Sequence, residues 1–152
     1  MQFYCGFDFG TSNTVVTLLG ENTEGQRVFS DSSVLFLPDC FPYAQKRFVG
    51  QRAVDEYVSA GMNGRFVQSI KSVLPDPAFT QTLIYEKTYT PEELVAMIIK
   101  DYKDRIEDFI GERVTGAVFG RPVKFAEEEP NDVLAENRLR AAAERCGFER
   151  IE

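Results

Sequence analysis

One short stretch near the amino terminus has side chains and backbone suited to phosphate chemistry. It runs from Asp8 to Thr14 and reads DFGTSNT. Asp8 is expected to end a strand on the face opposite its two phenylalanine neighbours, and Gly10 permits a tight turn. The turn then offers two hydroxyls, an amide and successive backbone N–H groups, which together can bind phosphate oxygens. A carboxylate beside such a turn suits hydrated Mg²⁺, because that ion prefers one or two carboxylates with phosphate oxygens and water.

Spacing alone supports two interpretations of this stretch. In the first, the turn cradles phosphates. In the second, it is a plain hairpin turn in which Ser12 and Asn13 hydrogen-bond their own backbone. It is neither a Walker loop nor a dinucleotide-binding fingerprint, because the glycines and the lysine of those motifs are missing.

Composition excludes several other kinds of chemistry. The chain has 152 residues, of which 43% are hydrophobic and 27% charged, as in a globular domain. It contains no histidine, which excludes histidine-based catalytic triads and histidine-ligated metals. The formal net charge is −7 and the basic residues are scattered, so a nucleic acid is not an expected partner.

The cysteines and the hydropathy pattern indicate a cytoplasmic protein. Cys5, Cys40 and Cys146 are odd in number and lack metal-like spacing, so we expect reduced thiols that fill apolar space. The amino terminus has no basic leader, and no segment approaches 18 uninterrupted apolar residues. We therefore expect neither secretion nor a membrane partner.

The first half of the chain predicts a meander followed by an insertion. Strand-like runs at residues 3–9, 14–19 and 27–29 are joined by short turns, which predicts three antiparallel strands. Residues 34–88 are broken by prolines, and their helical signal is confined to residues 51–59 and 64–74. We expect residues 1–33 and 89–152 to form an α/β core and residues 34–88 to form a smaller inserted subdomain.

The second half predicts a helix, a buried strand and another helix. Thr90, Pro91 and Glu93 form a capping box, and Gly111 closes the helix. Its apolar stripe is expected at three- and four-residue steps: Leu94, Ile98, Tyr102, Ile106 and Phe109.

A strand is expected at residues 114–119, and Asn131 or Asp132 is expected to cap a last helix that ends at Gly147. The residues after Gly147 look like the approach to another strand, so we expect a fragment of a longer protein. The order of elements predicts a mixed α/β sheet.

Motifs along nearly the whole chain resemble DnaK-type, seventy-kilodalton heat-shock chaperones of the actin-like ATPase superfamily. Residues 6–14 resemble the first phosphate motif of that superfamily, and Asn13 is typical of its chaperone and bacterial actin branches. Residues 49–53 resemble the chaperones' VGxxA motif, and residues 66–74 resemble the helix that carries their catalytic lysine. Residues 109–118 resemble the helix-to-strand passage YLGexVtxAV. Residues 117–125 and 142–148 are closer to the YegD-like branch.

The resemblance implies the actin-like ATPase (ribonuclease H-like) fold and a site for ATP or ADP with Mg²⁺. It implies that Asp8 coordinates Mg²⁺ through water. It also implies that the turn after Asp8 lines the β- and γ-phosphate pocket through Gly10, Thr11, Ser12 and Asn13.

Two further residues take roles from the resemblance alone. Lys71 would place positive charge beside the γ-phosphate, whereas without the resemblance it would be interpreted as a solvated helix lysine. Pro122 would match the proline that relays nucleotide state. The family's relay arginine has no counterpart, because Glu136 stands at the aligned position after a lengthened loop.

The implied function is that of the ATP-binding lobe of a chaperone ATPase, with unfolded polypeptides and co-chaperones as partners of the full-length protein. The family's other site residues would lie beyond Glu152. We therefore expect residues 1–152 alone to be inactive and to bind Mg-ATP only in the millimolar range or more weakly. The alternatives are a filament-forming bacterial actin, a small-molecule kinase of the same superfamily and a nucleotide-binding pseudo-ATPase.

Overall fold

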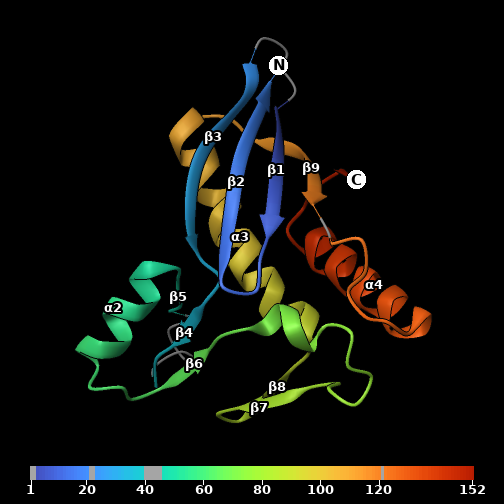
Figure 1. Cartoon of the computed structure of the whole chain (residues 1–152). Coiled ribbons are helices and arrows are strands. Elements are labelled where there is room, and N and C mark those ends of the chain that lie inside the picture. Colours follow the sequence, from blue (N-terminus) through green and yellow to red (C-terminus); the bar gives the residue numbers. More distant parts are fainter. Residues whose placement is uncertain (1–2, 21–22, 40–45, 121) are drawn as a thin grey trace.

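A five-stranded mixed sheet forms the centre of the molecule (Figure 1). The computed structural model describes residues 3–20, 23–39, 46–120 and 122–152. The strand order is β10-β9-β1-β2-β3. Its strands are β1 (Phe3–Phe9), β2 (Asn13–Gly20), β3 (Thr23–Ser32), β9 (Val114–Gly120) and β10 (Arg150–Ile151).

The pairing confirms the predicted meander and the mixed sheet. β1 pairs antiparallel with β2, and β2 pairs antiparallel with β3. β9 pairs parallel with both β1 and β10. β2 and β3 are longer than predicted, because the ladder between them runs from the pair Asn13–Ser32 to the pair Gly20–Thr23. The carboxyl ends of three parallel strands therefore meet at one edge.

Helix α3 (Pro91–Ile110) lies behind the sheet in Figure 1 and begins at the predicted capping box. The Thr90 hydroxyl accepts from the Glu93 N–H, and the Glu93 carboxylate accepts from the Thr90 N–H. Gly111 ends the helix with φ 72°. The predicted apolar stripe is buried except at Phe109, which is 73% exposed. Ile110 packs against the core in its place, because a four-residue step from Ile106 stays on the buried face.

The described residues between β3 and α3 include two small sheets, helix α2 (Gln51–Ser59) and the 3₁₀ turn η1 (Ile70–Val73). β4 (Leu35–Leu37) pairs antiparallel with β5 (Phe48–Val49) and β6 (Arg65–Val67), and β7 (Thr82–Ile84) pairs with β8 (Lys87–Tyr89). Helix α2 (Gln51–Ser59) has the predicted bounds. One hydrophobic cluster runs through this segment and the rest of the molecule, including Leu35, Ile70 and Ile98.

The predicted helix over residues 64–74 is wrong. Its first part is β6, which pairs with β4, and its second part is η1 (Ile70–Val73), a single 3₁₀ turn. Ser69 adopts left-handed backbone with φ 55°, which an α-helix does not accommodate, and Pro75 follows directly. Lys71 therefore lies on a tight turn and not on a long helix.

Helix α4 (Glu129–Arg145) begins earlier than predicted, with Glu128 at the N-cap. Pro130 lies in the first turn, where its missing N–H costs no hydrogen bond. Asp132 was expected as a cap, but its carboxylate accepts from the backbone N–H of Phe125. The helix ends as predicted, with Gly147 at φ 75°, and β10 follows.

Two of the three cysteines are buried free thiols, as expected of apolar filler. Burial raises the pKa of Cys5 and of Cys146 to about 12. Cys40 falls outside the described residues. Among the helices of the described ranges, none combines the length and apolar character needed to span a membrane.

Candidate functional site

The turn between β1 and β2 presents a row of unpaired polar groups. The Gly10 N–H donates to the Asn13 carbonyl oxygen over 3.0 Å, which closes the turn. Thr11, Ser12 and Asn13 are all exposed. Within the described part of the chain, the backbone N–H groups of Thr11 and Ser12 find no protein acceptor. Free N–H groups beside hydroxyls are the donors that phosphate oxygens require.

Gly10 is required by this turn for lack of space. A Cβ atom at position 10 would lie 2.1 Å from the Asn13 carbonyl oxygen, closer than any real contact. The close approach of the Gly10 and Asn13 backbones in this turn therefore excludes every side chain at position 10.

The turn is supported from beneath by a buried hydroxyl network that the sequence did not indicate. The Ser33 N–H donates to the Ser12 carbonyl over 2.8 Å, and the Ser33 and Thr14 hydroxyls lie 2.7 Å apart. The Tyr102 hydroxyl donates to the Ser32 carbonyl over 2.7 Å, and burial raises the tyrosine's pKa far above its ordinary value. The one available signal was Tyr102 itself, because a buried tyrosine hydroxyl needs a partner.

Asp8 lies beside this turn at the carboxyl end of β1. Its side chain is exposed, while Phe7 and Phe9 are buried on the opposite face, as the alternation predicts. Asp8 pairs with Gly120 at the end of β9, so it lies where two parallel strands end together. Crevices outside the carboxyl ends of parallel strands are the usual ligand sites of open α/β sheets.

Lys71 comes to the same edge from η1. Its neighbours Ile70 and Leu74 are buried in the core, which holds the turn while the lysine itself is half-buried. Burial lowers the pKa of Lys71, and the Asp8 carboxylate opposes this effect. The ammonium nitrogen lies 5.6 Å from the centre of the Phe125 ring. The structure thus brings Asp8 and Lys71 within electrostatic reach of each other, from positions 63 residues apart in sequence.

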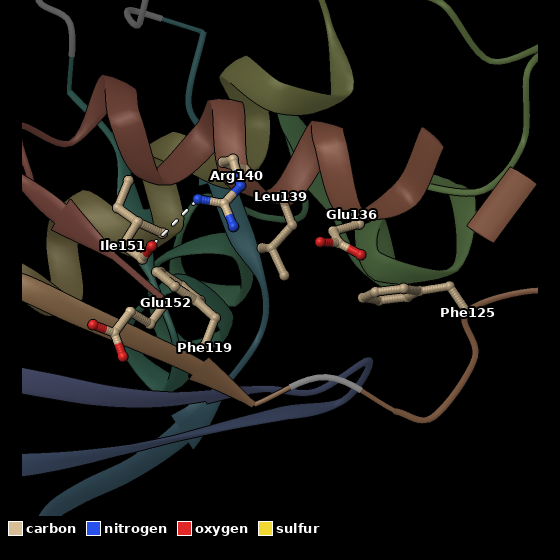
Figure 2. Close-up of a pocket in the computed structure, with 7 residues that line it drawn as sticks. All are labelled: Phe119, Phe125, Glu136, Leu139, Arg140, Ile151 and Glu152. Atoms are coloured by element: carbon tan, nitrogen blue, oxygen red, sulfur yellow. Dashed lines mark hydrogen bonds between the residues drawn. The ribbon is translucent and has the colours of Figure 1, made fainter. Parts of the chain in front are cut away.

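The loop after β9 borders this edge. Pro122 is exposed there, and Asp132 of α4 holds the backbone of Phe125. A cavity of about 70 Å³ lies between this loop, α4 and β10 (Figure 2). It is lined by Phe119, Phe125, Glu136, Leu139, Arg140, Ile151 and Glu152. None of the predicted site residues lines this cavity.

The acidic residues suit a metal held chiefly through water. Among the described residues, no three acidic or cysteine side chains gather as a metal cluster. One carboxylate, that of Asp8, stands beside the free N–H groups of the turn. This donor set fits Mg²⁺, which keeps several waters and takes its remaining ligands from phosphates.

A comparison with protein-family models adds an independent finding. The model described as Hsp70 protein matches residues 42–140, which is more than half of the chain. The matched range includes Lys71, Pro122 and much of α4. It begins after the β1–β2 turn, so the Asp8 end of the site rests on the geometry above.

Proposed function

The chain belongs to the Hsp70 protein family, and on this premise we propose that it is the first lobe of the nucleotide-binding domain of a chaperone ATPase. In this proposal the β1–β2 turn binds the β- and γ-phosphates of ATP, and the full-length protein hydrolyses the nucleotide with Mg²⁺. The family match favours this function over a filament-forming actin or a small-molecule kinase.

The observation that carries the proposal is the meeting of the turn, Asp8 and Lys71 at one edge. The free N–H groups of Thr11 and Ser12 would donate to phosphate oxygens, with the hydroxyls and the Asn13 amide beside them. Asp8 would orient the water ligands of Mg²⁺, and that ion, when bound, would neutralise charge on the phosphates.

Lys71 would act on the transferred phosphoryl group. Charge spreads over the oxygens of that group in the transition state, so a fixed cation stabilises it more than it stabilises bound ATP. The half-buried position of Lys71 strengthens this effect, because fewer waters screen its charge.

Several finer assignments belong to the same proposal. Residues 34–88 would be an inserted subdomain on a core of residues 1–33 and 89–152. Pro122, exposed at the end of β9, would relay the state of the nucleotide. The chain would belong to the YegD-like branch, which its motifs at residues 117–125 and 142–148 resemble, with polypeptide clients and co-chaperones as partners of the full-length protein.

The lysine gives the sharpest test of this function. In the full-length protein, Lys71→Ala should lower the rate of ATP hydrolysis by about 10² to 10³, the usual loss for one electrostatic contact to the transition state. Nucleotide affinity should change little, because the donors of the turn remain. Lys87→Ala is the control, since Lys87 is an exposed lysine on β8. Unchanged turnover in Lys71→Ala would show that this lysine has no part in the chemistry.

A further inference from the structure

Arg138 of α4 is a buried charge whose two terminal nitrogens face the segment that follows Lys71. It is only 6% exposed. Its two terminal nitrogens donate to four backbone carbonyl oxygens, at 3.2, 2.9, 2.9 and 2.9 Å: those of Val73, Leu74, Asp76 and Phe79. Its third nitrogen lies 3.7 Å from the Glu92 carboxylate of α3. Every nitrogen of the side chain is therefore engaged.

The four carbonyls belong to a chain of tight turns that begins at Lys71. The Leu74 N–H donates to the Lys71 carbonyl, and the Asp76 N–H donates to the Val73 carbonyl. Within these turns the Val73 and Asp76 carbonyls accept one backbone N–H each, from Asp76 and Phe79, while the Leu74 and Phe79 carbonyls have no backbone donor among the described residues, so the segment has room for a further donor. Arg138 supplies it from 65 residues away, and the planar fork of an arginine suits several acceptors at once.

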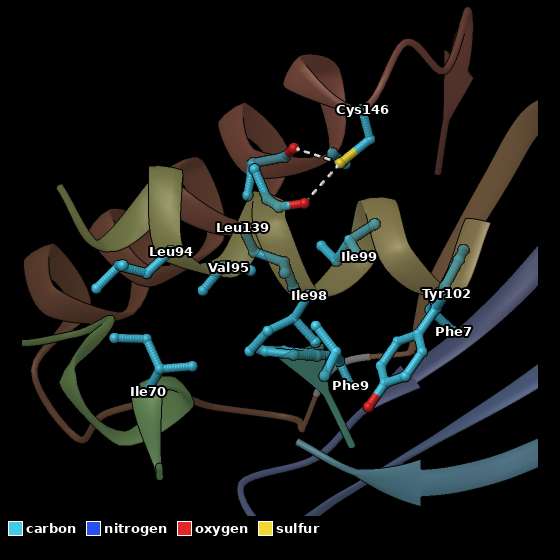
Figure 3. Packing of buried hydrophobic residues seen from close by; sticks show 14 of the residues in the cluster. Phe7, Phe9, Ile70, Leu94, Val95, Ile98, Ile99, Tyr102, Leu139 and Cys146 are labelled. Atoms are coloured by element: carbon cyan, nitrogen blue, oxygen red, sulfur yellow. Dashed lines mark hydrogen bonds between the residues drawn. The ribbon is translucent and has the colours of Figure 1, made fainter. Parts of the chain in front are cut away.

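Helix α4, which carries Arg138, also contacts the residue that faces the Lys71 side chain. Six residues earlier on α4, the Asp132 carboxylate accepts from the backbone N–H of Phe125, the residue whose ring faces the Lys71 ammonium. Figure 3 shows Leu139 of α4 and Leu94 of α3 in the same apolar cluster as Ile70 of η1. α4 thus fixes both the backbone that carries Lys71 and the ring beside it.

We infer that Arg138 is a positioning residue for Lys71, which sets the place of the lysine amine by binding the carbonyls of residues 73–79. The inference rests on the proposed function for its catalytic meaning, and on geometry alone for its structural meaning. The inference gives a role to the buried Arg138 side chain. In the described part of the chain, its polar contacts are the carbonyls of residues 73–79 and the Glu92 carboxylate.

The first test needs no nucleotide and measures the reactivity of individual lysines. The full-length protein is treated with an acetylating reagent, and each lysine is followed by mass spectrometry. In Arg138→Lys, which keeps the charge but loses the fork, Lys71 should be acetylated several-fold faster than in the unmodified protein. Lys103, which is 4% exposed, should stay slow and so report that the fold is intact.

Arg140→Lys is the matched control for this test. Arg140 lies on the same helix, is exposed, and makes a single hydrogen bond to the Ile151 carbonyl. It should leave Lys71 unchanged. Should Arg138→Lys fail to fold, Glu92→Gln is the milder variant, because it weakens the ion pair that holds the Arg138 side chain. It should also raise the acetylation rate of Lys71. Equal Lys71 reactivity in the Arg138 and Arg140 variants, or in Glu92→Gln and the unmodified protein, overturns the inference.

The second test is a double-mutant cycle on ATP hydrolysis. Arg138→Lys should lower kcat by about tenfold to a hundredfold with KM nearly unchanged, because misplacing a catalytic group by about 1 Å has that order of effect. In a Lys71→Ala background the same change should lower kcat less than twofold, since the group it positions is gone. An equal loss in both backgrounds overturns the inference. If the unmodified protein does not hydrolyse ATP, the proposed function fails, and the acetylation test still decides the role of Arg138.

Discussion

At the scale of single residues, the candidate site depends on a half-buried lysine and an exposed aspartate that come from distant parts of the chain. The strand-and-turn pattern around Asp8 was sufficient to predict the β1–β2 turn and the position of its carboxylate. Lys71 could be singled out only through resemblance, because nothing in its local sequence distinguishes it from a solvated lysine. Ser33 and Arg138 escaped prediction, because their contacts join residues 19 and more apart in sequence.

Gly10 gives a prediction at this scale. Gly10→Ala should open the β1–β2 turn, because the added methyl group would lie 2.1 Å from the Asn13 carbonyl oxygen. We expect a loss of about 1–3 kcal/mol in the free energy of unfolding, as for other overpacked sites. We also expect loss of nucleotide binding. Urea unfolding and Mg-ATP titration measure the two effects, and Gly111→Ala, where a Cβ meets no neighbour within 4 Å, controls for strain alone.

A native-like affinity in Gly10→Ala would contradict the assigned role of the turn. Stability alone does not decide the matter, because Gly111, unlike Gly10, has a positive φ, and its substitution costs stability without approaching the site.

Glu107 gives a prediction about pH. Its carboxylate accepts from the ammonium of Lys103 and from the backbone N–H of Val114, both over 2.8 Å. Burial alone would raise the pKa of Glu107, but these hydrogen bonds, with the charges of Lys103 and Lys100, hold it below the ordinary value of 4.5. The carboxylate therefore stabilises the fold above pH 4.5, and this contribution is lost as the pH falls through the lower, folded-state pKa.

Glu107→Gln tests this linkage. At pH 7 the variant should be less stable by about 1–3 kcal/mol, the range for a hydrogen bond to a charged group. The difference from the unmodified protein should shrink below pH 4.5. Urea unfolding at several pH values measures it, with Glu112→Gln as the exposed control. A stability difference that does not change with pH would contradict the assignment.

At the scale of elements, local signals predicted the bounds of helices best where residues adjacent in sequence form the ends, as in α3. The bounds of α3 followed from its capping box and from Gly111, and the bounds of α2 were also predicted. The stretch over residues 64–74 was not predicted, because its structure comes from pairing with β4 and from the left-handed Ser69. The start of α4 was misplaced, because Asp132 binds another loop.

The start of helix α2, which carries the VGxxA motif, is held by a residue of β3. Gly50, at φ 73°, leaves no room for a side chain beside the Asp31 carboxylate. That carboxylate accepts from the Gln51 N–H over 2.7 Å, so a residue of β3 caps the helix in place of a local side chain. The same carboxylate binds Arg105 of α3 through both terminal nitrogens. The glycine of the VGxxA motif is thus explained by a junction of three elements.

We predict that Asp31→Ala loosens this junction. The free energy of unfolding should fall by about 2–3 kcal/mol, because a helix cap and a charge-assisted pair are lost together. Hydrogen exchange should be fastest at the first amides of α2. Asp55→Ala is the control, since Asp55 is exposed and, among the described residues, its carboxylate accepts a hydrogen bond only from the Gln51 side chain. Equal exchange rates in the two variants would contradict the capping role.

At the scale of the whole molecule, the parallel pairing of β10, β9 and β1 determines where the candidate site lies. It brings the end of β1, the loop after β9 and the start of α4 to one edge, and η1 packs against that edge from the segment between β3 and α3. The order of strands and helices in the sequence was enough to predict a mixed sheet. Which loops would meet could not be predicted, since that follows from the packing of η1 under α4.

The central claim is that the β1–β2 turn and Lys71 bind the phosphates of a nucleotide. The most direct measurement is a titration of isotope-labelled protein with Mg-ATP, followed by the NMR signals of individual amides and of the lysine side chains. We expect the amide signals of Gly10 to Asn13 and the side-chain signal of Lys71 to move together with one binding curve, and to stay still in Gly10→Ala. Shifts confined to other regions, or no shift at these residues at tens of millimolar Mg-ATP, would contradict the account.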